Sequence, residues 1–201
     1  WSTVNYGFHY QYMHNTLQLN RRIQGDKPFF SNISRLSGIS STDWSWGPLL
    51  ADLDNDGWKD LFISNGIRRE INHRDFFNDI KLRPMSSDSL LYYTEQMPSE
   101  AIANFTFQNN SDFTFTDVTE SWGLDQKNFS NGATYADLDN DGDLELIVNN
   151  VDQEAQIYRN NSTNNFIKVK LKGSDQNLIG IDSRVFVKTS DNNQMQELTL
   201  S

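Results

Sequence analysis

Two short stretches of the chain concentrate carboxylates at alternating positions. The first, DLDNDGWKD, covers residues 52–60, and the second, DLDNDGDLE, covers residues 137–145. In both, acids stand at positions 1, 3, 5 and 9, and a glycine that allows a sharp turn stands at position 6. Oxygen ligands that converge from a tight loop suit Ca²⁺, which takes about 6–8 of them at about 2.3–2.6 Å. The spacing therefore predicts two calcium sites.

The predicted ligands follow from these positions. In the first loop they are the carboxylates of Asp52, Asp54, Asp56 and Asp60, with the backbone carbonyl of Trp58 at position 7. In the second loop they are the carboxylates of Asp137, Asp139, Asp141 and Glu145, with the backbone carbonyl of Asp143. The alternative is that both stretches are acidic surface turns that hold no metal.

An EF-hand does not fit these loops. Its loop needs a bidentate glutamate at position 12 and a helix on either side. Position 12 is Ile63 in the first loop and Val148 in the second, and short β-like runs flank both loops. The sequence therefore predicts calcium loops between strands.

The acidity of the chain lies mainly in these loops. Its 201 residues include 27 acids and 17 Lys plus Arg, which gives a net charge of −10. The first loop has four acids and one lysine and the second five acids and no base, so together they carry −8 and the remaining residues −2. Net acidity disfavours binding to a phosphate backbone, although this weighs less once the loops are set apart.

Composition excludes several other classes of protein. The chain has no cysteine, which excludes disulfides, thiolate metal sites and cysteine nucleophiles. Its 12% aromatic content argues against intrinsic disorder. No run approaches the roughly 18 apolar residues of a membrane-spanning helix. Because the chain begins at Trp1, we expect it to be a piece of a longer protein.

Similar β-like runs recur around the two loops. Residues 44–51 and 129–136 lead into the loops, residues 29–39 and 113–124 lie upstream, and residues 17–20, 105–110 and 156–161 form three copies of a further element. Periodic short strands of this kind predict a mostly β fold, and specifically a partial β-propeller.

The two loops are further apart than one propeller blade allows. They are separated by 85 residues, against the ~40–50 of a usual blade. The excess predicts a small helical insertion, with helices over residues 70–81 and 87–97. In the tail, strands are expected over residues 165–171, 184–188 and 195–200. We therefore expect four segments: 1–66 with the first loop, 67–103 as the insertion, 104–165 with the second loop, and 166–201 as a last blade strand and the start of another β domain.

At these residues the chain resembles the FG-GAP/VCBS repeat family, whose blades carry calcium loops like those of the integrin α-subunit propeller. The run NGATYADLDNDGDLELIVNN, then IYRNN and NFIKVKLKG, is similar to Bacteroidetes surface or secreted proteins that join such repeats to an ASPIC/UnbV domain, related to cartilage acidic protein. The repeat resemblance covers about residues 13–165, and the ASPIC/UnbV resemblance about residues 166–201. It implies the same ligands, although Glu145 departs from the usual aspartate at position 9, so altered geometry or affinity is expected there.

The resemblance also implies an extracytoplasmic location: cell surface, outer-membrane-associated or secreted. Calcium sites of about 10⁻⁴–10⁻³ M can fill there. We expect a non-catalytic calcium-binding segment that binds a protein or carbohydrate ligand. One alternative is the accessory region of a polysaccharide-degrading enzyme. The other is an RNA-binding protein of ASPIC/UnbV type, for which the tail supplies the cations Lys168, Lys170, Lys172, Arg184 and Lys188.

Other residues that could do chemistry form no recognisable site. There is no G-x-S-x-G motif, and His9, His14 and His73 fall in no triad or metal spacing, so we expect no catalytic residue. Trp44, Trp46 and Trp58 lie around the first loop, where they either pack inside a blade or form a contact platform for a ligand.

Overall fold

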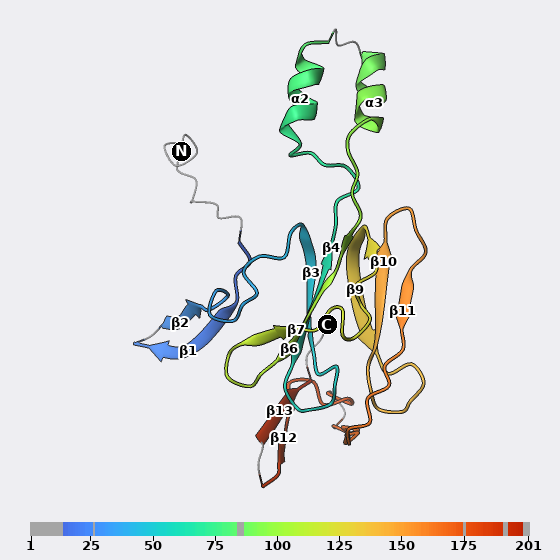
Figure 1. Cartoon of the computed structure of the whole chain (residues 1–201). Coiled ribbons are helices and arrows are strands. Elements are labelled where there is room, and N and C mark those ends of the chain that lie inside the picture. The colour runs from blue at the N-terminus through green and yellow to red at the C-terminus, as the bar shows by residue number, and fades with distance from the viewer. Residues whose placement is uncertain (1–13, 26, 84–86, 175, 191–192, 199–201) are drawn as a thin grey trace.

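The chain folds mostly into β structure (Figure 1). The computed structural model describes residues 14–25, 27–83, 87–174, 176–190 and 193–198. The strands are β1 (Gln18–Gln24), β2 (Lys27–Asn32), β3 (Ser45–Ala51), β4 (Asp60–Asn65), β5 (Ile102–Ala103), β6 (Phe105–Asn109), β7 (Phe115–Asp117), β8 (Lys127–Asn128), β9 (Ser130–Ala136), β10 (Glu145–Asn150), β11 (Gln156–Tyr158), β12 (Arg184–Lys188) and β13 (Asn193–Glu197). The helices are α2 (Arg74–Lys81) and α3 (Ser87–Glu95). The predicted mostly β class is confirmed.

Two antiparallel sheets carry the acidic loops. The first has the order β3-β4-β6-β7, and the second the order β11-β10-β9. Strand β4 lies between β3 and β6, and all six of its residues are buried. A strand covered on both faces carries apolar side chains at consecutive positions, which explains the run Leu61, Phe62, Ile63. Within the described residues, the sheets close into neither a barrel nor a propeller.

The two sheets repeat one hairpin in the same register. In the first, Ala51 pairs with Asp60 and Leu50 with Leu61. In the second, Ala136 pairs with Glu145 and Tyr135 with Leu146. Each of these positions is displaced by 85 residues. The acidic loops thus join the equivalent strands of two copies of one unit.

The third strand of each unit repeats as well, at a different spacing. Leu61 pairs with Phe107 of β6, and the equivalent Leu146 pairs with Tyr158 of β11. The first pair is separated by 46 residues of chain and the second by 12, a difference of 34. The insertion that contains α2 and α3 accounts for this difference.

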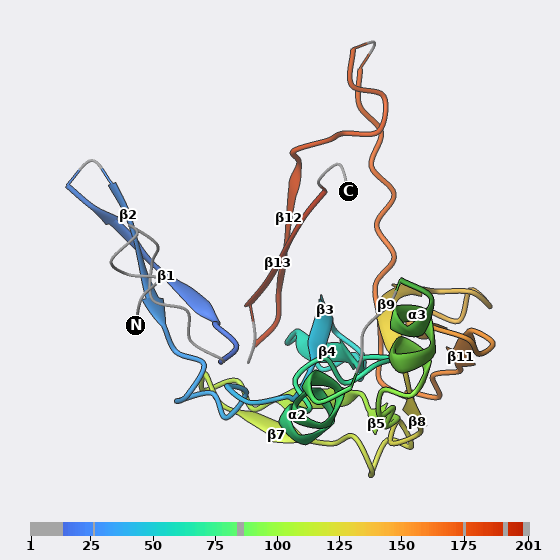
Figure 2. The ribbon, with the colours of Figure 1, turned by 90° about the horizontal axis from the view of Figure 1, so that it is seen from above.

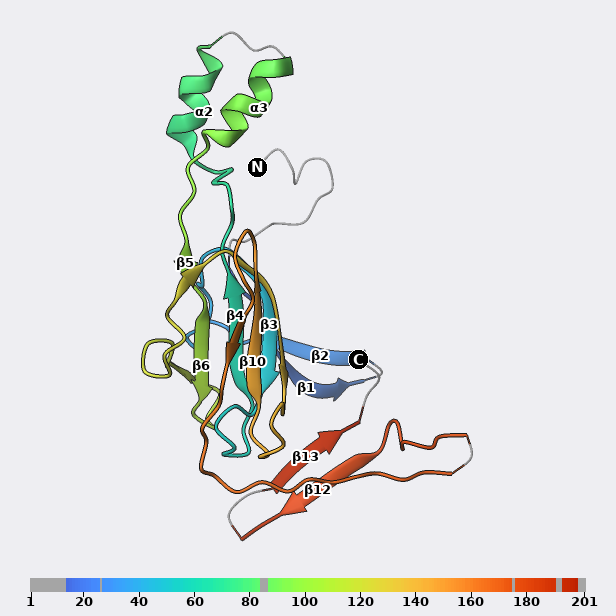
Figure 3. The ribbon, with the colours of Figure 1, turned by 90° about the vertical axis from the view of Figure 1, so that its right-hand side faces the viewer.

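Each sheet has an equivalent hydrophobic core. One core consists of Ile39, Leu61, Ile63 and Phe107. The other contains Leu124, Leu146 and Val148, with Tyr158 packed against them. Phe62 of β4 also belongs to this second core, so the face of the first sheet opposite Leu61 packs against the second sheet. Strand β9 is the strand of the second sheet that lies against β3 and β4, and Figure 3 shows the strands of the second sheet overlying those of the first.

The predicted helical insertion is present and protrudes from one end of the sheets (Figure 1). Helix α2 begins four residues later than predicted, because the His73 side chain caps it by accepting a hydrogen bond from the Phe76 backbone nitrogen. His73 is therefore a helix cap. His14 is exposed, and His9 lies outside the described residues.

The tail differs from the prediction in one segment. The strand expected over residues 165–171 is wrong, since no strand forms there. The alternating side chains remain exposed, with Ile167 71% and Val169 50% accessible, because no neighbouring strand pairs with their backbone. The strand over 184–188 is confirmed as β12, and β13 pairs with it (Figure 2). Residues 199–200 of the last predicted strand lie outside the described residues.

Candidate metal centres

Both acidic loops adopt the same backbone turn. The residue at position 4 has a positive φ in each, 56° at Asn55 and 64° at Asn140. Position 6 has a φ of 95° at both Gly57 and Gly142. Asparagine tolerates left-handed backbone better than most residues, and glycine adopts it freely. The DxDNDG sequence therefore folds each loop back so that side chains at odd positions converge.

In the first loop, three carboxylates converge. One oxygen each from Asp52, Asp54 and Asp60 lies within 4.8 Å of the others, close enough to hold one metal ion. Backbone nitrogens fix the carboxylate of Asp52: Asp56 and Gly57 each donate to it at 3.0 Å. The third member, Asp60, is fully buried.

Asp56, the predicted ligand at position 5 of the first loop, lies outside this group. The Asp56 side chain is exposed, and its Oδ1 accepts a hydrogen bond from the Trp58 backbone nitrogen at 2.7 Å. The Trp58 side chain is 42% exposed beside the loop, and Trp46 is 52% exposed. These tryptophans therefore leave part of their rings at the surface.

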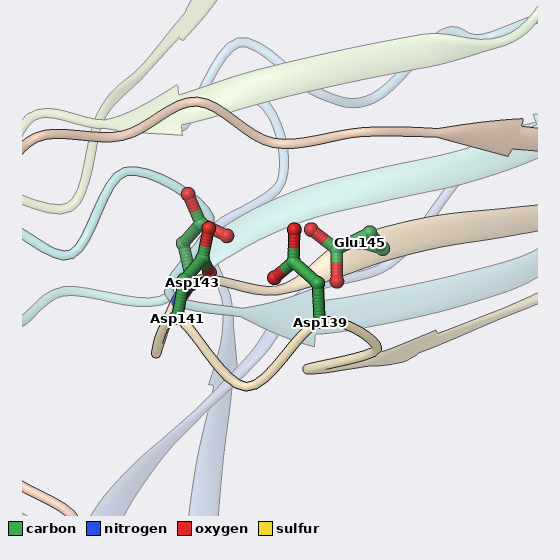
Figure 4. A group of neighbouring side chains, drawn as sticks. All are labelled: Asp139, Asp141, Asp143 and Glu145. Atoms are coloured by element: carbon green, nitrogen blue, oxygen red, sulfur yellow. Dashed lines mark hydrogen bonds between the residues drawn. The ribbon is translucent and has the colours of Figure 1, made fainter.

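In the second loop, four carboxylates converge, those of Asp139, Asp141, Asp143 and Glu145 (Figure 4). One oxygen from each lies within 4.8 Å of the others. The sequence interpretation used only the backbone carbonyl of Asp143, yet its side chain is buried within this group. Asp137, the predicted ligand at position 1, lies outside the group and pairs with Lys168 at 3.0 Å.

The acid at position 9 binds the backbone in the same way in both units. Asp60 accepts hydrogen bonds from the backbone nitrogens of Leu53 and Asn109, both at 3.0 Å. Glu145 accepts them from Leu138 at 2.7 Å and from Asn160 at 3.4 Å. The longer arm of the glutamate thus reaches equivalent partners. This acid ties its loop to the third strand of its sheet in the first unit, and to the residues just after the third strand in the second unit.

The acid at position 3 also has an equivalent partner in each unit. Gln108 Nε2 donates to Asp54 Oδ2 at 2.7 Å. Arg159 Nη2 donates to Asp139 Oδ2 at 2.9 Å. The sequence interpretation did not predict these contacts, although the repeated triplets QNN at residues 108–110 and RNN at residues 159–161 indicate equivalent positions in the two units. The first loop has a neutral donor where the second has a cation.

The segment after β11 connects the two loops. Asn160 Nδ2 donates to the carbonyls of Leu53 at 2.6 Å and Leu144 at 3.2 Å, one in each loop. Ser162 Oγ and Asn164 Nδ2 donate to the Asp54 carbonyl at 2.9 and 2.7 Å. The two centres are therefore parts of one hydrogen-bonded region.

The crowding of acids shifts their proton affinities. Burial raises the pKa of Asp60 to about 7, against the opposing effect of its two backbone donors. Burial, hydrogen bonding to Asp141 and nearby negative charge raise the pKa of Asp143 to about 6. By contrast, the hydrogen bond from Lys168 lowers the pKa of Asp137. A bound cation would lower the pKa values of Asp60 and Asp143, because opposite charge favours the ionised form.

The two groups of carboxylates could each hold a metal ion. No helix in the described part of the chain is long and apolar enough to cross a membrane. No protein-family model matches the chain, and no curated protein matches it either.

Proposed function

We propose that this chain is a calcium-binding, non-catalytic segment of a partial β-propeller of the FG-GAP/VCBS type. The observation that carries the proposal is the repetition of one acidic loop, in the same register, at the end of the same hairpin in two stacked sheets. Only oxygen atoms converge in the two groups, and hard oxygen ligands favour Ca²⁺ over softer metals.

Calcium would act here as a structural ion. The first centre joins β3 to β4 and the second joins β9 to β10, so an ion in each loop fixes the strands that flank it. The ion would also neutralise carboxylates whose mutual repulsion opposes folding. The two stacked repeats, which do not close into a ring within the described residues, fit part of a propeller whose other blades belong to a longer chain.

In this proposal the protein works outside the cytoplasm, at the cell surface or after secretion, and binds a protein or carbohydrate ligand. The half-exposed ring of Trp58 in the first loop supplies an aromatic surface for that contact. A glycan array probed with the calcium-loaded chain, with Trp58→Ala as the control, tests the carbohydrate form of the proposal. Signals that are equal for both proteins would count against Trp58 as the contact.

The calcium proposal has a direct test. Equilibrium dialysis with elemental analysis should find two Ca²⁺ per chain, and Asp54→Asn combined with Asp139→Asn should abolish both. Calcium should also raise the melting temperature, because a ligand at 100 times its Kd stabilises the fold by about 2.7 kcal/mol per site. An unchanged melting curve in millimolar calcium, with no bound metal, would refute the proposal.

A further inference from the structure

The second loop already contains a cation from the protein itself. Lys168 Nζ lies 3.0 Å from Asp137 Oδ2 and 3.4 Å from Asn140 Oδ1. Asp52, at the equivalent position of the first loop, accepts hydrogen bonds from backbone nitrogens of its own loop. Backbone groups of Asn140 and Gly142 likewise bind Asp137, so Lys168 is an additional, positively charged partner of the first acid in the second loop.

Packing supports the position of Lys168. The ring of Phe166, two residues earlier, lies directly on the turn: a Cβ added to Gly142 would come within 2.2 Å of it. The segment that carries the lysine therefore has an apolar contact as well as an ionic one on the second loop.

The carboxylate of Asp143 lacks the kind of partner that Lys168 gives to Asp137. Its side chain is 3% exposed, and its Oδ1 has no hydrogen-bond partner among the described residues. A buried, unpaired carboxylate oxygen is costly unless a cation binds it. Asp137 Oδ1 is also without a partner, but that carboxylate already has a counter-ion in Lys168. The unsatisfied charge of the second loop thus lies at Asp143.

We propose that the second centre holds its cation with the side chains of Asp139, Asp141, Asp143 and Glu145, and that Lys168 takes the place of the metal as the partner of Asp137. This inference rests on the proposed calcium-binding function. It changes the role of two residues: Asp143 binds through its carboxylate, and Asp137 binds no metal. The first centre has Trp58 at the position of Asp143, so the two centres differ in their ligands.

The substitutions that separate the two assignments are Asp143→Asn and Asp137→Asn. Both are made in the full chain carrying Asp54→Asn, which disables the first centre. Isothermal titration calorimetry with Ca²⁺ then reports binding at the second centre alone. We expect Asp143→Asn to weaken calcium binding by about tenfold or more, since it removes a ligand charge. Asp137→Asn should change it by less than about threefold. Melting curves in chelator verify that each variant folds.

Lysine variants give a second readout that leaves Asp143 in place. Lys168→Met removes a positive charge next to the centre and should tighten calcium binding severalfold. Lys170→Met, a matched change two residues away, should leave it unchanged. Equal affinities for these two variants would overturn the role of Lys168.

The outcomes distinguish this inference from the function on which it rests. If Asp137→Asn weakens calcium binding tenfold or more, Asp137 is a ligand and the inference is wrong, while the calcium-binding function stands. The same holds if Asp143→Asn binds calcium as the parent does. If the parent chain binds no calcium, both fail together.

Discussion

Asp60 Oδ1 accepts a hydrogen bond from the Asn109 backbone nitrogen at 3.0 Å, and this contact joins the first acidic loop to strand β6. The other oxygen of Asp60 accepts from Leu53 inside the loop. Glu145 makes the same pair of contacts in the second unit, to Asn160 and Leu138. The last acid of each loop therefore has a structural role that does not depend on a bound metal.

The first prediction separates this role from metal binding. Asp60→Ala leaves two backbone donors without their acceptor, and each buried unpaired group costs about 1–3 kcal/mol. The free energy of unfolding in chelator should therefore fall by at least about 1 kcal/mol. Asp56→Ala, at an exposed position, should change it by less than about 0.5 kcal/mol. Urea unfolding in chelator measures both, and equal values would show that Asp60 acts only through metal.

The second prediction concerns pH. Folding raises the pKa of Asp60 to about 7 and of Asp143 to about 6, from an ordinary value of 3.8. The stability that these two acids contribute is complete below 3.8 and is lost as the pH rises through 6 to 7. The metal-free chain should therefore melt at a higher temperature at pH 5 than at pH 8. Acids whose pKa is lowered by folding, such as Asp137, change the pH dependence of stability only below about pH 4, where they become protonated.

Calcium should reverse this pH dependence. The ion binds ionised carboxylates, so its stabilising effect should be larger at pH 8 than at pH 5. Scanning calorimetry with and without calcium measures both curves. A metal-free chain that is more stable at pH 8 would contradict the assigned shifts.

Much of the repeat could be predicted from sequence, because the strands flanking each loop follow local rules. The apolar run of β4, the left-handed Asn and Gly positions and the alternating acids each lie within a few residues of one another. The strand expected over residues 165–171 failed for a different reason. Alternation at Ile167 and Val169 indicates an extended backbone, but a strand also needs a partner, which the local sequence does not specify.

The same limit applies to the second centre. Lys168 lies 31 residues from Asp137 in the chain, and only the path of the segment after β11 brings them together. The buried Asp143 likewise receives a backbone hydrogen bond from Ser162, a residue outside its loop. The positions of the acids were therefore predictable, but which of their oxygens converge was not.

The third prediction tests the stacking of the two sheets. Phe62 of β4 is 1% exposed and packs against Leu124, Leu146 and Val148. Phe62→Ala should lower the free energy of unfolding by about 3–5 kcal/mol, because it removes a buried ring and leaves a cavity. Phe30→Ala, whose ring is 49% exposed on β2, should have a much smaller effect. Similar losses for the two variants would contradict a shared core between the sheets.

The fourth prediction exchanges the partners of the position 3 acids. Arg159 places a positive charge 2.9 Å from Asp139, whereas Gln108 places a neutral donor 2.7 Å from Asp54. Since like charges repel, Arg159→Gln should tighten calcium binding at the second centre, and Gln108→Arg should weaken it at the first. Arg159 is 70% exposed, so solvent screening limits the effect to severalfold.

The control for this exchange keeps the charge and changes the shape. Arg159→Lys should leave calcium affinity close to that of the parent chain if charge is the cause. Calcium titrations are made in a chain whose other centre is disabled, at low and at high ionic strength. The gain in Arg159→Gln should shrink at high salt, because screening already weakens the repulsion that this variant removes. A gain that is independent of salt, or one that Arg159→Lys shares, would mean that Arg159 acts through loop geometry and not through its charge.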